Sequence, residues 1–177
     1  MKKRSTRPRI GITLGDPAGI GPEVIAAALS SGVASEKCEY RLMGERHGVK
    51  AGKPTDHSAR MALAAMEEAA LLASAGEIDA LVTGPVSKSR LHDVGFEFPG
   101  QTEFFAARWK VENFAMCLTG KGLTVGLVTG HVALAEVPRL LSSEEIVRVG
   151  GLLAEFVRLR DAGRSDGPRK RVKNGAN

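Results

Sequence analysis

The sequence is poor in aromatic residues and in cysteine. Aromatic side chains make up 5% of the 177 residues, so a core has to be built mainly from Ala, Val, Leu and Ile. The two cysteines, Cys38 and Cys117, are far apart and stand in apolar, strand-like runs. This usage argues against a disulfide framework and predicts buried, reduced thiols in a cytoplasmic protein.

Long hydrophobic runs are also lacking. No stretch approaches the roughly 18 consecutive apolar residues of a transmembrane helix. The basic start, MKKRSTRPRI, is not followed by the apolar segment of a signal peptide. We therefore expect a cytoplasmic protein that does not associate with membranes.

The net charge of +5 is concentrated at the two ends of the chain. Five cations lie in residues 1–9 and five more follow Gly163, which leaves fifteen cations against nineteen acidic residues in 10–163. The basic character therefore belongs to an N-terminal tail, 1–8, and to a tail at 164–177 that we expect to be disordered. This distribution argues against a nucleic-acid-binding domain.

Strand and helix patterns alternate through residues 9–163. Strands are predicted at 9–15 and 38–44, and the continuous apolar run 78–84 is typical of a buried parallel strand. Runs 113–120 and 123–130 are expected to pair as a hairpin. Helices are predicted at 22–31, 56–75, 87–95, 102–109 and 142–163. The order of elements predicts an α/β fold with a mostly parallel sheet.

Two of these helices carry signals at their ends. Gly76 follows the helix 56–75 at the position where a left-handed residue commonly ends a helix. Ser142 and Glu145 have the spacing of a capping box at the start of the last helix.

The segment ITLGDPAGIGPE joins the first predicted strand to the first predicted helix. Gly15, Gly19 and Gly21 permit positive φ and close backbone approach, and the following helix presents free N–H groups. Such a turn is suited to an anionic group or to another backbone, and a tight turn without a ligand is the alternative. It is neither a dinucleotide fingerprint nor a P-loop, because the spacing G-x-G-x-x-G and a following G-K-[ST] are absent.

Polar residues near the ends of later elements are candidates for a site. Lys88 follows the strand in LVTGPVSK, where ligands of open α/β sheets lie, although without further context a surface lysine is the commoner case. Gln101 and Thr102 begin a short helix and can hydrogen-bond a ligand, unless Thr102 is only its N-cap. His131 follows the last strand and can bind a metal through neutral imidazole, whereas a lone histidine is more often a loop residue.

Four segments together resemble one known family. GITLGDPAGIGPEV, DALVTGPVSK, GFEFPGQTEFFA and VGLVTGHVALAEVP are similar, in order and approximate spacing, to segments of the 4-hydroxythreonine-4-phosphate dehydrogenase family, over roughly residues 8–160. The resemblance implies an incomplete α/β/α sandwich like that of isocitrate and isopropylmalate dehydrogenases. In that fold two lobes flank a cleft, and the second subunit of a homodimer completes each site.

The resemblance also implies a reaction. The family transfers a hydride to NAD from a phosphorylated hydroxy acid, 4-phosphooxy-L-threonine, in vitamin B6 biosynthesis, and the 3-oxo acid then loses CO₂. A divalent metal (Zn, Mg or Co), held by three histidines, polarises the substrate's hydroxyl oxygen.

Matching the segments residue by residue implies roles in this chain. His131 resembles the first metal histidine, and Thr102 resembles a substrate-binding threonine that stands beside Gln101. Asp16 and Lys88 match positions that line the cleft, and we expect them to be catalytic. The match assigns no residue to NAD.

Three departures from the family pattern limit what the chain is expected to do. Gln101 stands where the family has a histidine and cannot take a proton near neutral pH, and the stretch 44–52 is shorter than in the family. The family also continues past position 163, with the other two metal histidines and most phosphate and NAD contacts. We therefore expect a partial dehydrogenase region at 9–163 with little activity alone. The alternatives are half of a split enzyme and a non-catalytic phosphometabolite-binding protein.

Overall fold

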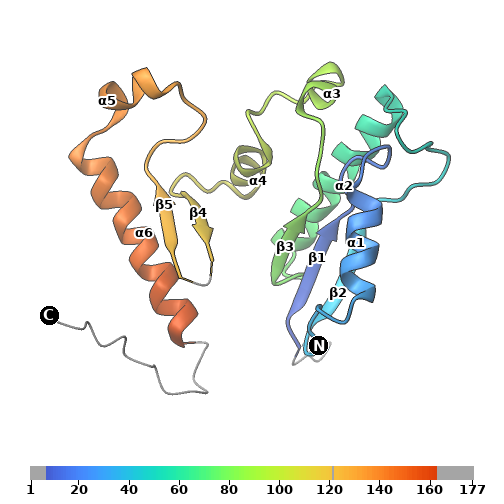
Figure 1. Cartoon of the computed structure of the whole chain (residues 1–177), viewed down its shortest axis with the longest axis horizontal. Coiled ribbons are helices and arrows are strands. Elements are labelled where there is room, and N and C mark those ends of the chain that lie inside the picture. Colours follow the sequence, from blue (N-terminus) through green and yellow to red (C-terminus); the bar gives the residue numbers. More distant parts are fainter. Residues whose placement is uncertain (1–6, 121, 163–177) are drawn as a thin grey trace, which may run out of the picture. The chain divides into compact units, whose positions relative to one another are not determined.

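The computed structural model describes residues 7–120 and 122–162 (Figure 1). The chain separates into two compact units, Met1–Val111 and Glu112–Asn177. Apart from Arg7 and Pro8, the predicted tails lie outside the described residues. None of the described helices combines the length and the hydropathy needed to cross a bilayer.

The first unit is built on a three-stranded parallel sheet. Its strands are β1 (Arg9–Thr13), β2 (Glu39–Met43) and β3 (Ala80–Thr83), in the order β2-β1-β3. In this register Ile12 of β1 lies opposite Leu42 of β2 and Val82 of β3. The predicted parallel α/β arrangement is therefore confirmed, with strand ends within two residues of those expected.

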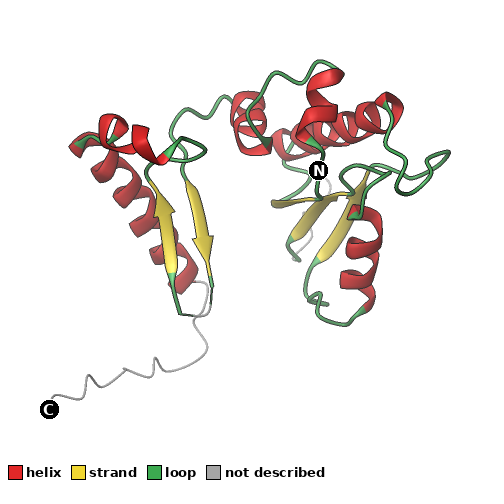
Figure 2. Ribbon diagram, turned by 45° about the horizontal axis from the view of Figure 1, so that its top comes forward, coloured by secondary structure: helices red, strands yellow, loops and turns green. Residues whose placement is uncertain are grey.

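Four helices accompany this sheet: α1 (Gly21–Ser30), α2 (Asp56–Ser74), α3 (Lys88–Asp93) and α4 (Gln101–Trp109). The long helix α2 contacts all three strands, and Figure 2 shows α1 on the other side of the sheet. α2 begins with a reciprocal capping box between Thr55 and Ser58. Gly76 follows the C-cap Ala75, as predicted, and its φ of +63° and its N–H bond to the Ala73 carbonyl close the last turn.

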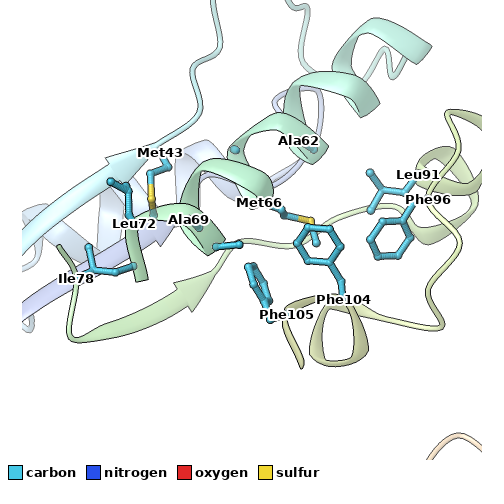
Figure 3. Close-up of a cluster of buried hydrophobic side chains, with 12 residues drawn as sticks. Met43, Ala62, Met66, Ala69, Leu72, Ile78, Leu91, Phe96, Phe104 and Phe105 are labelled. Atoms are coloured by element: carbon cyan, nitrogen blue, oxygen red, sulfur yellow. The ribbon is translucent and has the colours of Figure 1, made fainter. Parts of the chain in front are cut away.

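The core of the first unit lies between α2 and the segments that carry α3 and α4 (Figure 3). α2 contributes alanines and Met66, whose small or flexible side chains leave room for larger neighbours. Phe104 is fully buried and meets Phe105 edge-on, with the ring centroids 5.1 Å apart. Five of the eight aromatic residues lie in α4 or shortly before it: Phe96, Phe98, Phe104, Phe105 and Trp109.

The second unit is a hairpin packed on a helix. β4 (Met116–Thr119) and β5 (Thr124–Leu127) pair antiparallel, as predicted, and are followed by η1 (Leu134–Glu136), α5 (Val137–Leu140) and α6 (Ser143–Ala162). Gly126 of β5 faces α6 closely, since a Cβ there would lie 3.3 Å from Val149. Arg148 of α6 donates to the Asn113 side chain and to the Phe114 carbonyl, at 2.9 and 3.0 Å.

Three predictions about local structure are corrected. β3 is parallel but not buried, because it is an edge strand with no described strand on its outer side. Cys117 is exposed, because a two-stranded hairpin leaves most of its side chains uncovered, and Cys38, which directly precedes the edge strand β2, is half-buried. The capping box of α6 is only half formed: Ser142 accepts from Glu145 N–H, but the Glu145 carboxylate binds Arg148 instead of reaching back.

Candidate active site

The glycine-rich turn after β1 packs against a second backbone. Gly15 has a φ of +76°, and a Cβ there would overlap the carbonyl oxygen of Pro85. The N–H of Asp16 donates to that same carbonyl at 2.9 Å. In return, Gly84 N–H donates to Thr13 O at 2.8 Å. Of the two occupants suggested by the sequence, another backbone is the one found here, and glycine is required for its close approach.

Asp16 holds this turn in shape. The residue is buried, with 6% of its surface exposed, and its Oδ1 accepts a hydrogen bond from Ala18 N–H at 2.9 Å. Its main-chain carbonyl accepts from Gly19 N–H, also at 2.9 Å. An aspartate that bonds the backbone two residues on forms an Asx-turn. One carboxylate oxygen of this predicted catalytic residue therefore stabilises the turn.

Gln101 connects α4 to the carboxyl end of β3. Its Nε2 donates to the carbonyl oxygen of Gly84 at 3.3 Å. Its Oε1 is buried and receives no hydrogen bond from the described residues. Leaving a buried acceptor without a donor costs free energy. The hydrogen-bonding capacity of the Gln101 amide is therefore only partly used.

Lys88 reaches the N-terminus of α4 from the first position of α3. A Cβ placed on Gly100, the N-cap of α4, would lie 3.6 Å from Lys88 Nζ and 3.0 Å from Glu103 Oε2. An ammonium and a carboxylate thus approach the same N-cap. The sequence analysis missed Glu103. The available signal was its place in the first turn of a helix, where acidic side chains are favoured.

Thr102 lies beside these groups as the second residue of α4. It is exposed, and the N-cap is Gly100, so the alternative in which Thr102 caps the helix is excluded. Phe104 and Phe105, which follow it, are both buried in the core and fix the helix that carries it.

His131 belongs to the second unit. It follows β5, is exposed, and has a φ of +58°, an uncommon value for a residue with a side chain. Residues 7–120 and 122–162 contain no group of three or more His, Cys, Asp or Glu side chains placed to hold a metal ion. His131 alone does not fit such a centre, which takes three or four ligands, and we derive no reaction step through a metal.

The four predicted residues of the first unit therefore lie near the carboxyl end of the sheet. Asp16 and Gln101 bond the connection that follows β3, and Lys88 and Thr102 stand at the start of α4. A parallel α/β unit with polar side chains at the carboxyl ends of its strands has the organisation of the α/β ligand-binding enzymes.

The chain belongs to the family of the pyridoxal phosphate biosynthetic protein PdxA, whose family model matches residues 22–166. This agrees with the resemblance found in the sequence. The family is one of dehydrogenases, as the names of its curated relatives state.

Two relatives named 4-hydroxythreonine-4-phosphate dehydrogenase illustrate the match. The protein of Trichlorobacter lovleyi is 31% identical over 80% of this chain and 55% of its own length. The protein of Geobacter metallireducens is 34% identical over 81% of this chain and 55% of its own length. The chain spans about half the length of the curated relatives it matches.

Solved structures of proteins with the same name share the fold. The Burkholderia phymatum structure superposes with a TM-score of 0.71 at 25% identity, covering 82% of this chain and 56% of its own. The Klebsiella pneumoniae structure gives a TM-score of 0.68 at 25% identity, covering 93% and 62%. These matches confirm the α/β fold class.

Proposed function

We propose that this chain forms part of the substrate-binding site of a 4-hydroxythreonine-4-phosphate dehydrogenase. The family membership supports the reaction class. One observation supports the position of the site. The connections that follow β1 and β3 come together with the N-terminus of α4, around Gly84, Pro85 and Gly100. The proposed substrate is a phosphorylated hydroxy acid such as 4-phosphooxy-L-threonine.

Lys88 is the proposed anion-binding group. Its ammonium lies beside the first turn of α4, where the backbone N–H groups have no partners within the helix. A phosphate or carboxylate placed there meets a full positive charge and the positive end of the helix dipole. Glu103 borders the same space, so its carboxylate disfavours an anion that lies on its side of Gly100.

The neighbouring side chains orient the ligand in this proposal. Thr102 offers a hydroxyl that both donates and accepts hydrogen bonds. Gln101 remains neutral near pH 7, so it positions the end of β3 and transfers no proton. Asp16 keeps the first turn closed against Pro85 and thereby shapes the floor of the site.

The family resemblance extends the proposal to the cofactors and the assembly state. NAD accepts the hydride, and no residue of this chain is assigned to it. His131 is proposed as one ligand of a divalent metal whose other histidine ligands belong to the part of the family that this chain does not span. We further propose a homodimer in the cytoplasm, with little or no activity in this chain alone.

A calorimetric titration tests the proposed substrate site. The full chain, free of metal, is titrated with 4-phosphooxy-L-threonine, and Lys88→Met is compared with the unmodified sequence. A hydrogen bond to a charged group contributes about 1.5–3 kcal/mol, so we expect Kd to rise by about tenfold or more.

Lys110→Met is the matched control. It removes the same charge from an exposed residue at the opposite end of α4, so its Kd is expected to stay unchanged. Equal binding by the chain and by Lys88→Met, or no heat from the unmodified chain, would contradict the assignment of Lys88.

A further inference from the structure

Gly100, the N-cap of α4, leaves an open space that its backbone conformation does not require. Its φ of −167° and ψ of −179° are extended values, which residues with a side chain also adopt. Serine and asparagine are moreover better N-caps than glycine. A Cβ on Gly100 would lie 3.0 Å from Glu103 Oε2 and 3.6 Å from Lys88 Nζ. The missing side chain therefore leaves room between a carboxylate and an ammonium.

The two charged groups that border this space are available to a ligand. Lys88 is exposed and Glu103 is half-buried, and neither forms an ion pair or a hydrogen bond with another residue in 7–120 and 122–162. Glu103 stands at the position from which a capping-box residue accepts from the N-cap N–H, but the side chain makes no such bond to Gly100. Capping therefore does not account for where the Glu103 carboxylate lies.

Backbone donors border the same space. The N–H groups of residues 101–103 are in the first turn of α4 and have no partner within the helix. None of them donates to another acceptor in the described part of the chain. An anion placed here would meet these N–H groups and Lys88 on one side and Glu103 on the other.

The carboxylate of Glu103 limits which anions fit. An ionised carboxylate only accepts hydrogen bonds, so it repels an anion that has no proton to donate. A ligand carboxylate has no such proton near neutral pH. A phosphate monoester has one in its monoanionic form, because its second pKa is about 6.

We propose that Glu103 selects the phosphate group of the substrate, in its proton-bearing form, for the space beside Gly100. Lys88 and the N–H groups of α4 donate to the unprotonated phosphate oxygens, and the P–OH group donates to Glu103. The inference rests on the proposed function and specifies it: the phosphate end of the hydroxy acid, rather than its carboxylate end, lies at the start of α4.

Inorganic phosphate and sulfate are the probes that test this selection. Above its second pKa inorganic phosphate is a dianion that keeps one proton, so at about pH 8 it matches sulfate in charge and shape. The full chain is titrated with each anion at constant ionic strength. The NMR signal of the Thr102 methyl group reports binding, because Thr102 is the second residue of α4 and its methyl protons do not exchange with water.

We expect Kd for phosphate to be about tenfold or more below Kd for sulfate, the effect of one hydrogen bond to a charged group. In Glu103→Gln the two Kd values should become similar, because an amide can donate to either anion. The matched control is Glu97→Gln, since Glu97 is exposed and does not border Gly100, and this variant should keep the preference for phosphate.

Gly100→Ser separates the selection from helix stability. Its side chain fills the open space and can cap α4, so we expect weaker phosphate binding with an unchanged or higher free energy of unfolding. Unchanged phosphate binding by Gly100→Ser would overturn the proposal.

Equal Kd values for phosphate and sulfate in the unmodified chain, or a preference that persists in Glu103→Gln, would overturn the role of Glu103. The assignment of Lys88 would stand in both cases, provided that Lys88→Met weakens the binding of both anions. No shift with either anion, or binding that Lys88→Met leaves unchanged, would overturn the inference together with the assignment of Lys88.

Discussion

Gly15 lies where the connections that follow β1 and β3 touch, and its missing side chain is what allows them to touch. Glycine spacing in the sequence indicated that a close approach occurs here, but it did not distinguish an anion from a backbone as the neighbour. The partner, Pro85, is 70 residues away along the chain, and only the parallel pairing of β1 and β3 brings it near. The local sequence therefore marked Gly15 and Asp16 as candidates for a close approach, but it did not identify Pro85 as the neighbour.

Substituting Gly15 by alanine is expected to destabilise the first unit beyond the cost of its positive φ. The control is Gly48→Ala, because Gly48 has a φ of +74° and open space where a Cβ would lie. The control should cost about 1–2 kcal/mol from the left-handed conformation alone. Gly15→Ala adds an overlap with the Pro85 backbone, so we expect roughly 1–3 kcal/mol more. Urea unfolding followed by circular dichroism measures both, and equal costs would contradict the close approach.

Helix α4 is the element that carries most of the site, and its position depends on α2. Phe104 and Phe105 bury one face of α4 against α2, and Arg108 joins the same pair of helices through Glu67. The guanidinium of Arg108 also lies 4.7 Å from the centre of the Phe104 ring. The existence and type of these helices could be predicted from periodicity. The contact between them could not, because it depends on residues 41 positions apart.

The Glu67–Arg108 pair gives the fold a defined response to acid. The hydrogen bonds from Arg108 hold the pKa of Glu67 below its usual value. The pair therefore stabilises the folded chain above the ordinary glutamate pKa, about 4.3, and loses this contribution as the pH falls through the lowered pKa. Both side chains are about two-fifths exposed, so solvent screening keeps the contribution small.

Glu67→Gln is expected to lower the free energy of unfolding by roughly 0.5–1 kcal/mol at pH 7, and by progressively less below about pH 4. Urea unfolding at a series of pH values measures the difference. Glu97→Gln serves as the control, because Glu97 is exposed and has no ion pair within residues 7–120 and 122–162. A difference that grows as the pH falls would show that the stabilising charge is not that of Glu67.

At the scale of the whole molecule, the chain carries a recognisable family fold over about half the length of its relatives. The family could be predicted from four short segments, because each combines glycine, proline and polar residues at positions fixed by backbone packing. The exposure of β3 could not be predicted. A run such as IDALVTG is typical of a strand buried on both faces, whereas the burial of a strand depends on its neighbours, and no described strand lies on the outer side of β3.

We propose that this chain supplies one part of a dehydrogenase site and has little or no activity alone. The most direct measurement is the rate of NAD reduction by the chain, with 4-phosphooxy-L-threonine and a divalent metal, compared with the rate of His131→Ala. The rate of the unmodified chain is expected not to exceed that of His131→Ala. Turnover by the chain alone, well above that control, would contradict it.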